Sequence, residues 1–366
     1  MDVPSWLAPL QALVENRLPA EVGPGVAGLI GDHPSTYARS PRIWTPALAA
    51  LGIPASYLPL DVPADRLPAF IRWMRATDAC LGVNATSPHK AAVIPHLDEI
   101  DATAAAVGAV NTITRLPGGR LVGTNTDTAG LLAALRHDDG EGPVAAQLDG
   151  VRVLLIGAGG AAHAAAVALA RYVRGGDLLI VNRHEDRARA LADRVETLGG
   201  RATVARHDSL DGRLPDVGLV INASLCGQAG ILKRPEGWTC LEPYSALAPA
   251  NPAVLPPMPE DEFYDVWSAR SAADIDANDE TSRRRVRRLP RGAAVYDMIY
   301  APLETATIRH ARDAGLRAAN GRWMNIAQAA EAFVQHLCRP VLDARGMDRQ
   351  DASRRVERVM AGAWDQ

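Results

Sequence analysis

Lys90 and Asp127 are the residues of this sequence best suited to transfer a proton. Among 39 Lys and Arg residues, only Lys90 and Lys233 are lysines. An ammonium group can lose its proton when partly desolvated, whereas a guanidinium stays charged, so a lysine kept in an arginine-rich chain fits proton transfer. Asp127 closes a predicted strand, and a carboxylate beside a lysine holds the ammonium in place. The alternative interpretation is a chance surface lysine and an ordinary turn aspartate.

A glycine-rich segment indicates a dinucleotide site further along the chain. A predicted buried strand at 151–156 runs into Gly157-Ala158-Gly159-Gly160-Ala161-Ala162 and then an alanine-rich helix to about Tyr172. In this pattern Gly157 permits a tight turn, Gly159 lets the backbone approach a pyrophosphate, and Ala162 allows close helix packing. The helix N-terminus offers free N–H groups to phosphates. A purely structural glycine-rich turn is the alternative.

The end of the next predicted strand favours NADP over NAD. An acidic residue there would bind the ribose 2′-hydroxyl of NAD, but this strand ends at Asn182-Arg183. An arginine suits a 2′-phosphate, and Arg187 lies one helical turn further on. Glu185 and Asp186 argue the other way, although acids are favoured in the first turn of any helix.

Strands and helices alternate along the chain, which predicts an α/β fold. Buried strands are expected at 26–31, 55–60, 80–83, 151–156, 178–181, 217–221 and 293–296. A length of 366 residues accommodates two domains. The segment from about 229 to 291 is rich in Pro, Ala and charged residues. We interpret it as an inserted excursion, partly disordered and peripheral to the core, because long irregular segments are unusual inside a domain.

The composition excludes several classes of protein. A net charge of -3 and a pI of about 6.3 indicate no general affinity for nucleic acid. The four cysteines are scattered, so neither a zinc site nor a disulfide framework is expected. No secretory signal and no apolar stretch of membrane-spanning length is visible. These features predict a cytoplasmic protein with no nucleic-acid or membrane partner, as a monomer or homodimer.

Several segments, in this order, resemble the shikimate dehydrogenase family. The similar segments are Asn84–Lys90 (family N-V-T-x-P-x-K), Gly108–Thr112 (G-A-V-N-T), Asn125–Asp127 (N-T-D), Gly157–Ala162 (G-A-G-G-A-A), Asn182-Arg183 (N-R-T), Asp297–Glu304 (D-M-V-Y-N-P-x-E), and Met324 with Gln328 (M-x-x-x-Q). Together they cover nearly the whole chain outside the excursion and the two termini.

The resemblance implies two α/β domains and a specific reaction. An N-terminal substrate-binding domain, 1–128 completed by C-terminal helices at 323–366, would accompany a Rossmann-type NADP-binding domain at 129–322. The reaction would be reversible reduction of 3-dehydroshikimate to shikimate, in aromatic amino acid biosynthesis through chorismate, without a metal. Lys90 and Asp127 would be the acid/base pair. Substrate contacts would be Ser40, Thr86, Asn111, Tyr300 and Gln328; cofactor contacts would be Gly157, Gly159, Gly160, Ala161, Ala162, Asn182, Arg183, Arg187, Ala223 and Ser224.

Two departures bear on the substrate. The family's S-x-S-P is Ala38-Arg39-Ser40-Pro41 here, so one serine that holds the substrate carboxylate is missing. Ser35, Thr36, Tyr37 or Arg39 are the neighbours that can replace it. The family's Gly-Met beside the nicotinamide is Gly227-Gln228. Quinate, aminoshikimate or another cyclitol therefore stays open as the substrate, as does a ligand-sensing module without turnover.

Overall fold

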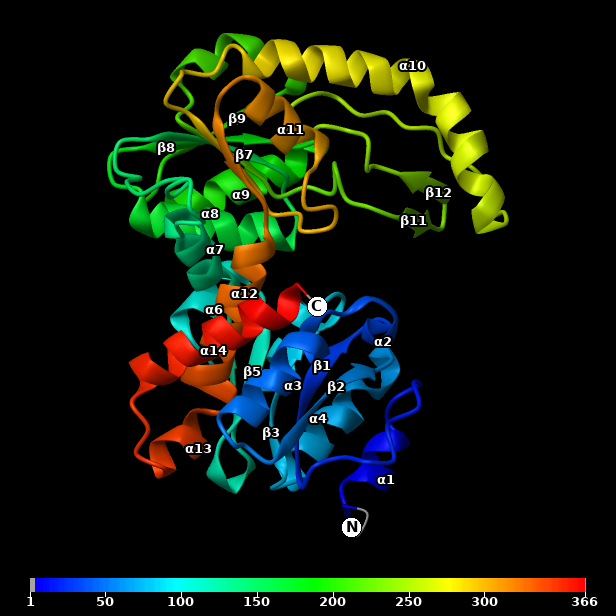
Figure 1. The fold of residues 1–366 in the computed structure, drawn as a ribbon, viewed down its shortest axis with the longest axis vertical. Helices are drawn as coiled ribbons and strands as arrows, with labels where there is room; N and C mark the ends of the chain where they lie inside the picture. The colour runs from blue at the N-terminus through cyan, green and yellow to red at the C-terminus, as the bar shows by residue number, and fades with distance from the viewer. Residues whose placement is uncertain (1–3, 366) are drawn as a thin grey trace. The chain divides into compact units, whose positions relative to one another are not determined.

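The computed structural model describes residues 4–365, which form two compact units. Unit 1 contains the described residues of 1–130 and 325–366, and unit 2 is the continuous segment Leu131–Met324. Figure 1 follows the chain through both units by colour. Each unit has one six-stranded sheet with helices packed against it, which confirms the predicted α/β class. No helix within 4–365 is long and apolar enough to cross a membrane.

The sheet of unit 1 has the strand order β2-β1-β3-β5-β6-β4. Its strands are β1 (Gly25–Gly31), β2 (Ala55–Asp61), β3 (Cys80–Ala85), β4 (Glu99–Ile100), β5 (Thr112–Arg115) and β6 (Leu121–Thr124). The sheet is parallel from β2 to β3, but β5 runs antiparallel to both β3 and β6. The segment between β5 and β6 is too short for a crossover, so these strands pair as a hairpin.

The helices of unit 1 begin and end where the sequence provides the signals. Asp101 caps α6 by accepting a hydrogen bond from the backbone N–H of Ala104 at 2.6 Å. Gly108 ends the same helix with a φ of 75°, a conformation that favours glycine. The other helices that lie mainly in this unit are α1 (Leu7–Gln11), α2 (Pro34–Tyr37), α3 (Ser40–Ala50), α4 (Leu67–Ala76), α5 (His89–Ala92), α12 (Arg322–Glu331), α13 (Arg339–Ala344) and α14 (Arg349–Trp364), with α6 at Ala102–Val107.

The sheet of unit 2 is entirely parallel in the order β14-β13-β10-β7-β8-β9. Its strands are β7 (Arg152–Ile156), β8 (Asp177–Val181), β9 (Ala202–Ala205), β10 (Leu219–Asn222), β13 (Ala294–Asp297) and β14 (Arg317–Ala319). Counted within the unit this order is 6-5-4-1-2-3, the arrangement of dinucleotide-binding folds. The strand order reverses between β7 and β10, and ligands bind beyond the carboxyl ends of the strands at such a point.

Helices bury both faces of this sheet. Side chains of one face, such as Leu155 and Ile180, pack with α7 (Asp127–Arg136), α8 (Gly160–Tyr172) and α9 (Glu185–Thr197). Side chains of the other face, such as Leu154 and Val295, pack with Val286 and with α11 (Ala306–Asp313). Both faces are covered, which explains why these strands read as continuous apolar runs.

The expected excursion at 229–291 is ordered, and its last part belongs to the core of unit 2. It contains a hairpin of β11 (Ile231–Arg234) and β12 (Gly237–Cys240) and the 27-residue helix α10 (Glu260–Val286). Figure 1 shows α10, in yellow, running from the hairpin to the sheet. The hairpin end has a small core of its own around Phe263 and Trp267. The other end supplies the crossover helix that parallel strands β10 and β13 require, so it is not peripheral.

A chain of buried polar side chains joins α10 to α11. The Oγ of Ser282 donates to the Oγ of Ser245 at 2.7 Å and lies 2.8 Å from Nδ1 of His310. Nε2 of His310 lies 2.7 Å from Oδ1 of Asp279. Burial is the largest influence on the imidazole and lowers the pKa of His310. Beside this chain, the guanidinium of Arg285 bonds Asp211 and two backbone carbonyls.

Candidate active site

Lys90 and Asp127 form an ion pair in unit 1. Lys90 lies on α5, which follows Pro88, and Asp127 is the first residue of α7. Nζ of Lys90 donates to Oδ2 of Asp127 at 2.7 Å. The Lys90 side chain is 33% exposed and the Asp127 side chain 15% exposed. The ammonium is therefore held in a fixed direction and stays partly accessible to solvent.

Asn111 fixes the second oxygen of the aspartate. Its Nδ2 donates to Oδ1 of Asp127 at 2.8 Å and to Oγ1 of Thr126 at 3.0 Å. Its Oδ1 accepts from the backbone N–H of Thr126 at 2.9 Å. Asn111 is 4% exposed. With one oxygen on Lys90 and the other on Asn111, the carboxylate has little freedom to rotate.

A buried hydrogen-bond chain extends from this pair across the sheet. Oγ1 of Thr112 donates to Oδ1 of Asn111 at 3.0 Å and accepts from Nδ2 of Asn84 at 3.1 Å. Oδ1 of Asn84 accepts from the hydroxyl of Tyr57 at 2.8 Å. Burial raises the pKa of Tyr57, against the opposing effect of a hydrogen bond with the Ser40 side chain. Tyr57 on β2 is thus connected through Asn84 on β3 and Thr112 on β5 to Asn111 and the ion pair.

Tyr57, Asn84 and Thr112 had no assigned role in the sequence analysis. Asn84 and Thr112 lie inside family-like segments, but Tyr57 stands alone on a strand that reads as ordinary core. Alternation along β2 predicts that Tyr57 shares one face with Pro59 and Asp61, but it does not identify what the hydroxyl meets. Only the pairing of three strands brings these side chains together.

Three further residues are predicted to contact the substrate: Gln328, Thr86 and Tyr300. Oε1 of Gln328 accepts from Oγ1 of Thr126 at 3.3 Å, which places Gln328 beside the Asn111 cluster. Thr86 follows β3, and its backbone N–H donates to the carbonyl of Ile30. Tyr300 follows β13 in unit 2 and is not among the residues that unit 1 brings together.

The loop around Ala38 already uses two of the four neighbours proposed to replace the missing serine. The Ser35 hydroxyl donates to Oδ2 of Asp61 at 2.5 Å, and the Thr36 hydroxyl donates to the His33 carbonyl at 2.8 Å. The Arg39 guanidinium lies 5.3 Å from the centre of the Trp364 ring. A methyl group on Gly31 would lie 3.6 Å from the Tyr37 hydroxyl and 2.3 Å from Cγ2 of Thr86. The Tyr37 hydroxyl and Thr86, a predicted substrate contact, therefore both lie close to Gly31.

The predicted dinucleotide residues lie at the carboxyl ends of neighbouring strands in unit 2. Gly157 leaves β7 with a φ of 115°, and a Cβ there would meet the carbonyl oxygen of Ala223 at 2.8 Å. Only glycine fits this turn, because a side chain would be both strained and crowded. Ala223 and Ser224 follow β10, the neighbour of β7. The sheet thus places two predicted cofactor segments side by side.

Gly159, Gly160, Ala161 and Ala162 form the start of α8. A Cβ on Gly159 or Gly160 would meet nothing within 4 Å, so space is open at the N-terminus of this helix. The first N–H groups of a helix have no partner within it, and they favour a phosphate group at that end. Ala162 is fully buried against the sheet face.

Two exposed arginines follow β8. Arg183 and Arg187 are exposed, and neither makes an ion pair with any residue of 4–365. Asn182 is held by a 2.8 Å bond from its Nδ2 to the carbonyl of His184. Glu185, the acid that argued for NAD, pairs with Arg189 at 2.6 Å. The local charge therefore favours an added phosphate.

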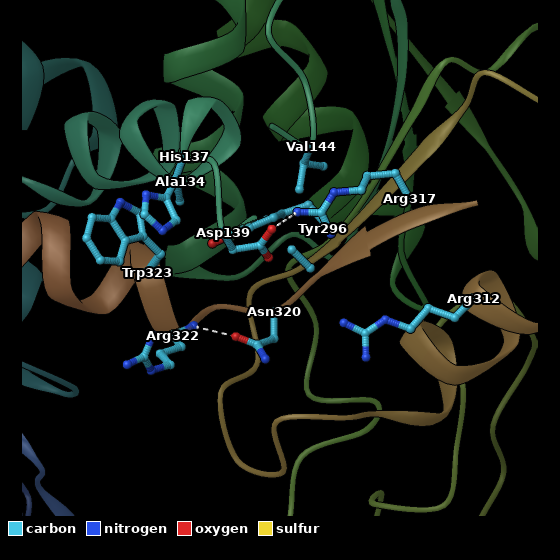
Figure 2. A pocket seen from close by; sticks show the side chains of 11 residues that line it. Ala134, His137, Asp139, Val144, Tyr296, Arg312, Arg317, Asn320, Arg322 and Trp323 are labelled. Atoms are coloured by element: carbon cyan, nitrogen blue, oxygen red, sulfur yellow. Dashed lines mark hydrogen bonds and ion pairs between the residues drawn. The ribbon is translucent and has the colours of Figure 1, made fainter. Parts of the chain in front are cut away.

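A separate pocket of unit 2 contains none of these predicted residues. Figure 2 shows it between Trp323, Tyr296 and three arginines. Its cavity volume is about 130 Å³. Arg317 pairs with Asp139 at 2.5 Å, and Arg312 pairs with Glu304 at 3.1 Å. Two of its three arginines are thus neutralised by acids, so the pocket is not a strong anion site. Among residues 4–365 no cluster of His, Cys, Asp and Glu is suited to a metal.

The fold and these two groups of residues define a dinucleotide-dependent oxidoreductase with a lysine–aspartate pair. Family models match at residues 29–113 (shikimate dehydrogenase substrate binding domain) and 143–236 (shikimate / quinate 5-dehydrogenase). A relative from Sphingopyxis alaskensis, named shikimate dehydrogenase (NADP(+)), is 35% identical over 84% of this chain and 89% of its own length. This chain belongs to the shikimate dehydrogenase family, as its segments predicted.

Two solved structures illustrate the likeness in fold. Shikimate 5-dehydrogenase from Thermus thermophilus, in complex with NADP(H) and shikimate, is 27% identical with a TM-score of 0.59, over 92% of this chain and 99% of that one. Quinate dehydrogenase from Corynebacterium glutamicum, in complex with NAD, is 24% identical with a TM-score of 0.65, over 90% and 98%. The second comparison shows the fold alone.

Proposed function

We propose that this protein reversibly reduces 3-dehydroshikimate to shikimate with NADPH, with Lys90 and Asp127 as the acid/base pair. The observation that carries the proposal is the 2.7 Å ion pair, held in place by Asn111. Relatives at about 35% identity over most of the chain bear the name shikimate dehydrogenase (NADP(+)), which supports the substrate and the cofactor.

The residues of unit 2 fit NADP. The open N-terminus of α8 suits the pyrophosphate, and the two exposed arginines suit the 2′-phosphate. Asn182, Arg183 and Arg187 would hold the adenosine end, and Ala223 with Ser224 would lie along the bound dinucleotide. The cofactor supplies the hydride, so the protein's task is to bind and orient both reactants.

Lys90 transfers the proton in the proposed reaction. Reduction of a ketone builds negative charge on its oxygen, and the ammonium of Lys90 stabilises that charge and donates its proton from Nζ to the oxygen. Asp127 keeps Nζ directed through its 2.7 Å hydrogen bond. Because the lysine side chain is one-third exposed, solvent returns the proton after each turnover. In the oxidation direction neutral Nζ accepts the hydroxyl proton.

The buried chain from Tyr57 to Asn111 supports the substrate end of the site. Ser40, Thr86, Asn111 and Gln328 are the proposed polar contacts in unit 1, and Tyr300 is the proposed contact from unit 2. The hydroxyls of Ser35 and Thr36 are bonded to Asp61 and to the His33 carbonyl, and Tyr37 or Arg39 is the proposed replacement for the missing serine. Either side chain reaches further than a serine, so this end of the site differs in shape from the family pattern.

That difference favours a second candidate substrate of the same class. Quinate, aminoshikimate or another cyclitol carboxylate fits the same acid/base pair, with the altered carboxylate end selecting among them. A sensing module without turnover has no need for the ion pair, and this argues against it.

An activity panel on the purified protein tests the proposal. Shikimate, quinate and aminoshikimate are each offered with NADP and with NAD, and reduced cofactor is followed by absorbance. We expect the highest kcat/KM with shikimate and NADP. Turnover of none of the three, with cofactor binding intact, would contradict the proposed reaction but leave the fold assignment unaffected.

A further inference from the structure

A buried carboxylate lies behind the predicted cofactor segment of unit 2. Asp297 ends β13, and its side chain is fully buried. Oδ1 accepts from Nδ2 of Asn222 at 2.9 Å and from the backbone N–H of Ile299 at 3.0 Å. Oδ2 accepts from the Thr305 hydroxyl at 2.7 Å. No Lys or Arg of residues 4–365 pairs with it, so these three donors offset only part of the cost of burying the charge.

One of these donors controls the segment after β10. Asn222 is itself fully buried, and its Nδ2 also donates to the carbonyl of Cys226 at 2.9 Å. Its Oδ1 accepts from the backbone N–H and the hydroxyl of Ser224 at 3.0 and 2.7 Å. The orientation of Asn222, fixed by Asp297, thus determines the conformation of Ala223 and Ser224. Because Gly157 packs against the Ala223 carbonyl, a shift there also reaches the glycine-rich turn.

The other two donors control the segment after β13. Ile299 N–H binds next to the strand end, and Thr305 closes the loop by capping α11, where its Oγ1 accepts from the Ile308 N–H at 3.3 Å. The backbone N–H of Ala229 donates to the carbonyl of Ala301 at 2.9 Å. Asp297 therefore fixes both ends of the loop 298–304 and, through Asn222, the neighbouring loop.

The requirement for a carboxylate follows from the donor count. Three donors converge from three directions, and two oxygens accept all of them. An asparagine at this position has only one accepting oxygen. Its NH₂ group would face either the Thr305 hydroxyl or the N–H donors of Asn222 and Ile299, and the hydrogen bonds on that side would be lost. A position that serves only core packing does not need a carboxylate, because an apolar side chain avoids the desolvation cost of a buried charge.

We propose that Asp297 is a positioning residue for the dinucleotide: it holds the segments after β10 and β13 in the conformation that binds NADP(H). This inference rests on the proposed function, because it assumes that NADP(H) is the ligand of these segments. Asp297 makes no direct contact in the proposal and acts through Asn222, Ile299 and Thr305.

The test compares direct NADPH binding, measured by fluorescence titration without substrate, with turnover and thermal stability. Asp297→Asn should weaken NADPH binding by about ten- to a hundredfold, the effect of a charge-assisted hydrogen bond. The KM for NADPH should rise in parallel while kcat at saturation changes by less than about threefold, because the acid/base pair lies elsewhere. Thr305→Val, which removes one donor, should give a smaller effect in the same direction.

Ser282→Ala is the matched control. It removes a buried hydrogen bond in the same unit whose partners, Ser245 and His310, belong to neither the segment after β10 nor the loop 298–304, so it should lower the Tm without changing NADPH affinity. Unchanged NADPH affinity in folded Asp297→Asn, or in Thr305→Val if the first variant does not fold, would overturn the inference. Wild-type protein that binds no NADPH would instead overturn the proposed function, so the two failures are distinguishable.

Discussion

Replacing Lys90 with methionine should abolish most of the catalytic turnover while leaving the fold nearly unchanged. The substitution removes the ammonium and its 2.7 Å bond to Asp127, but the bond from Asn111 to the carboxylate remains. A partly exposed ion pair contributes only about 0 to 1 kcal/mol to stability. Loss of an acid/base group, by contrast, lowers the rate by about 10² to 10⁴, or about 3 to 5 kcal/mol of transition-state stabilisation. Asp127→Asn should fall in the same range.

Steady-state kinetics of shikimate oxidation, with NADPH binding and Tm measured on the same samples, provide the assay. The chain offers a matched control in Lys233, its only other lysine, which is exposed and pairs with Glu260 on the hairpin side of unit 2. Lys233→Met should retain full activity. A Lys90→Met variant that turns over within about threefold of wild type would refute the mechanism, because general acid/base catalysis contributes far more than that.

Four further predictions follow from individual residues. Arg183→Asp should raise the KM for NADP more than tenfold relative to that for NAD, because a charge-assisted phosphate contact contributes about 1.5 to 3 kcal/mol; a wild type that prefers NAD would contradict the assignment. Ala38→Ser should lower the KM for shikimate by up to about tenfold if the missing hydroxyl only weakens binding, and should be neutral or harmful if Tyr37 or Arg39 already fills its place. Burial raises the pKa of Asp297 from its ordinary 3.8 to about 6, so this carboxyl group binds a proton at a higher pH in the folded protein than in the unfolded chain. Its contribution to the free energy of unfolding therefore rises as the pH falls from about 6 to about 4. Urea denaturation should therefore show the difference in free energy of unfolding between wild type and Asp297→Asn changing by about 3 kcal/mol across that window, since the nearby Cys226 thiol and Tyr296 hydroxyl have raised pKa values and stay neutral there. Arg285→Ala should cost about 1 to 3 kcal/mol of stability because the buried guanidinium donates to the carbonyls of Leu247 and His207, which lose this donor, whereas the exposed Arg284→Ala should cost less than about 1 kcal/mol; equal Tm values would place the end of α10 outside the core.

Much of the fold was predictable because it depends on local patterns. The buried strand before Gly157 and the helix after it are short-range signals, and the structure has both. The antiparallel β5 and the crossover role of α10 were not predicted, since strand direction and helix packing depend on which distant segments pair. The helix α10 was not predicted because its sequence is highly charged and weakly amphipathic. Only a few of its positions are buried, among them Phe263, Ser282 and Val286.

The candidate site also contains residues that local patterns identify and residues that only the pairing of distant segments brings together. Lys90 and Asp127 were identified because their residue types, rarity and spacing are visible along the chain. Tyr57 and Asp297 were not assigned roles because their partners lie on other strands: Tyr57 binds Asn84 on β3, and Asp297 binds Asn222 on β10. Linear sequence carries no direct record of such pairings between elements.

The Asp279–His310–Ser282 chain has a consequence for assigning function by geometry. It has the residue types and hydrogen-bond distances of a hydrolytic Ser-His-Asp arrangement, but its imidazole is reversed: Ser282 lies at Nδ1 and Asp279 at Nε2, whereas a hydrolytic serine bonds Nε2 and the carboxylate bonds Nδ1. A search by residue type and distance alone would therefore assign an esterase-like activity that the ring orientation contradicts. The Ser282 side chain has no exposed surface, so no ester can reach its oxygen. In this protein the three side chains connect α10 to α11. The burial of the serine oxygen identifies their role as structural.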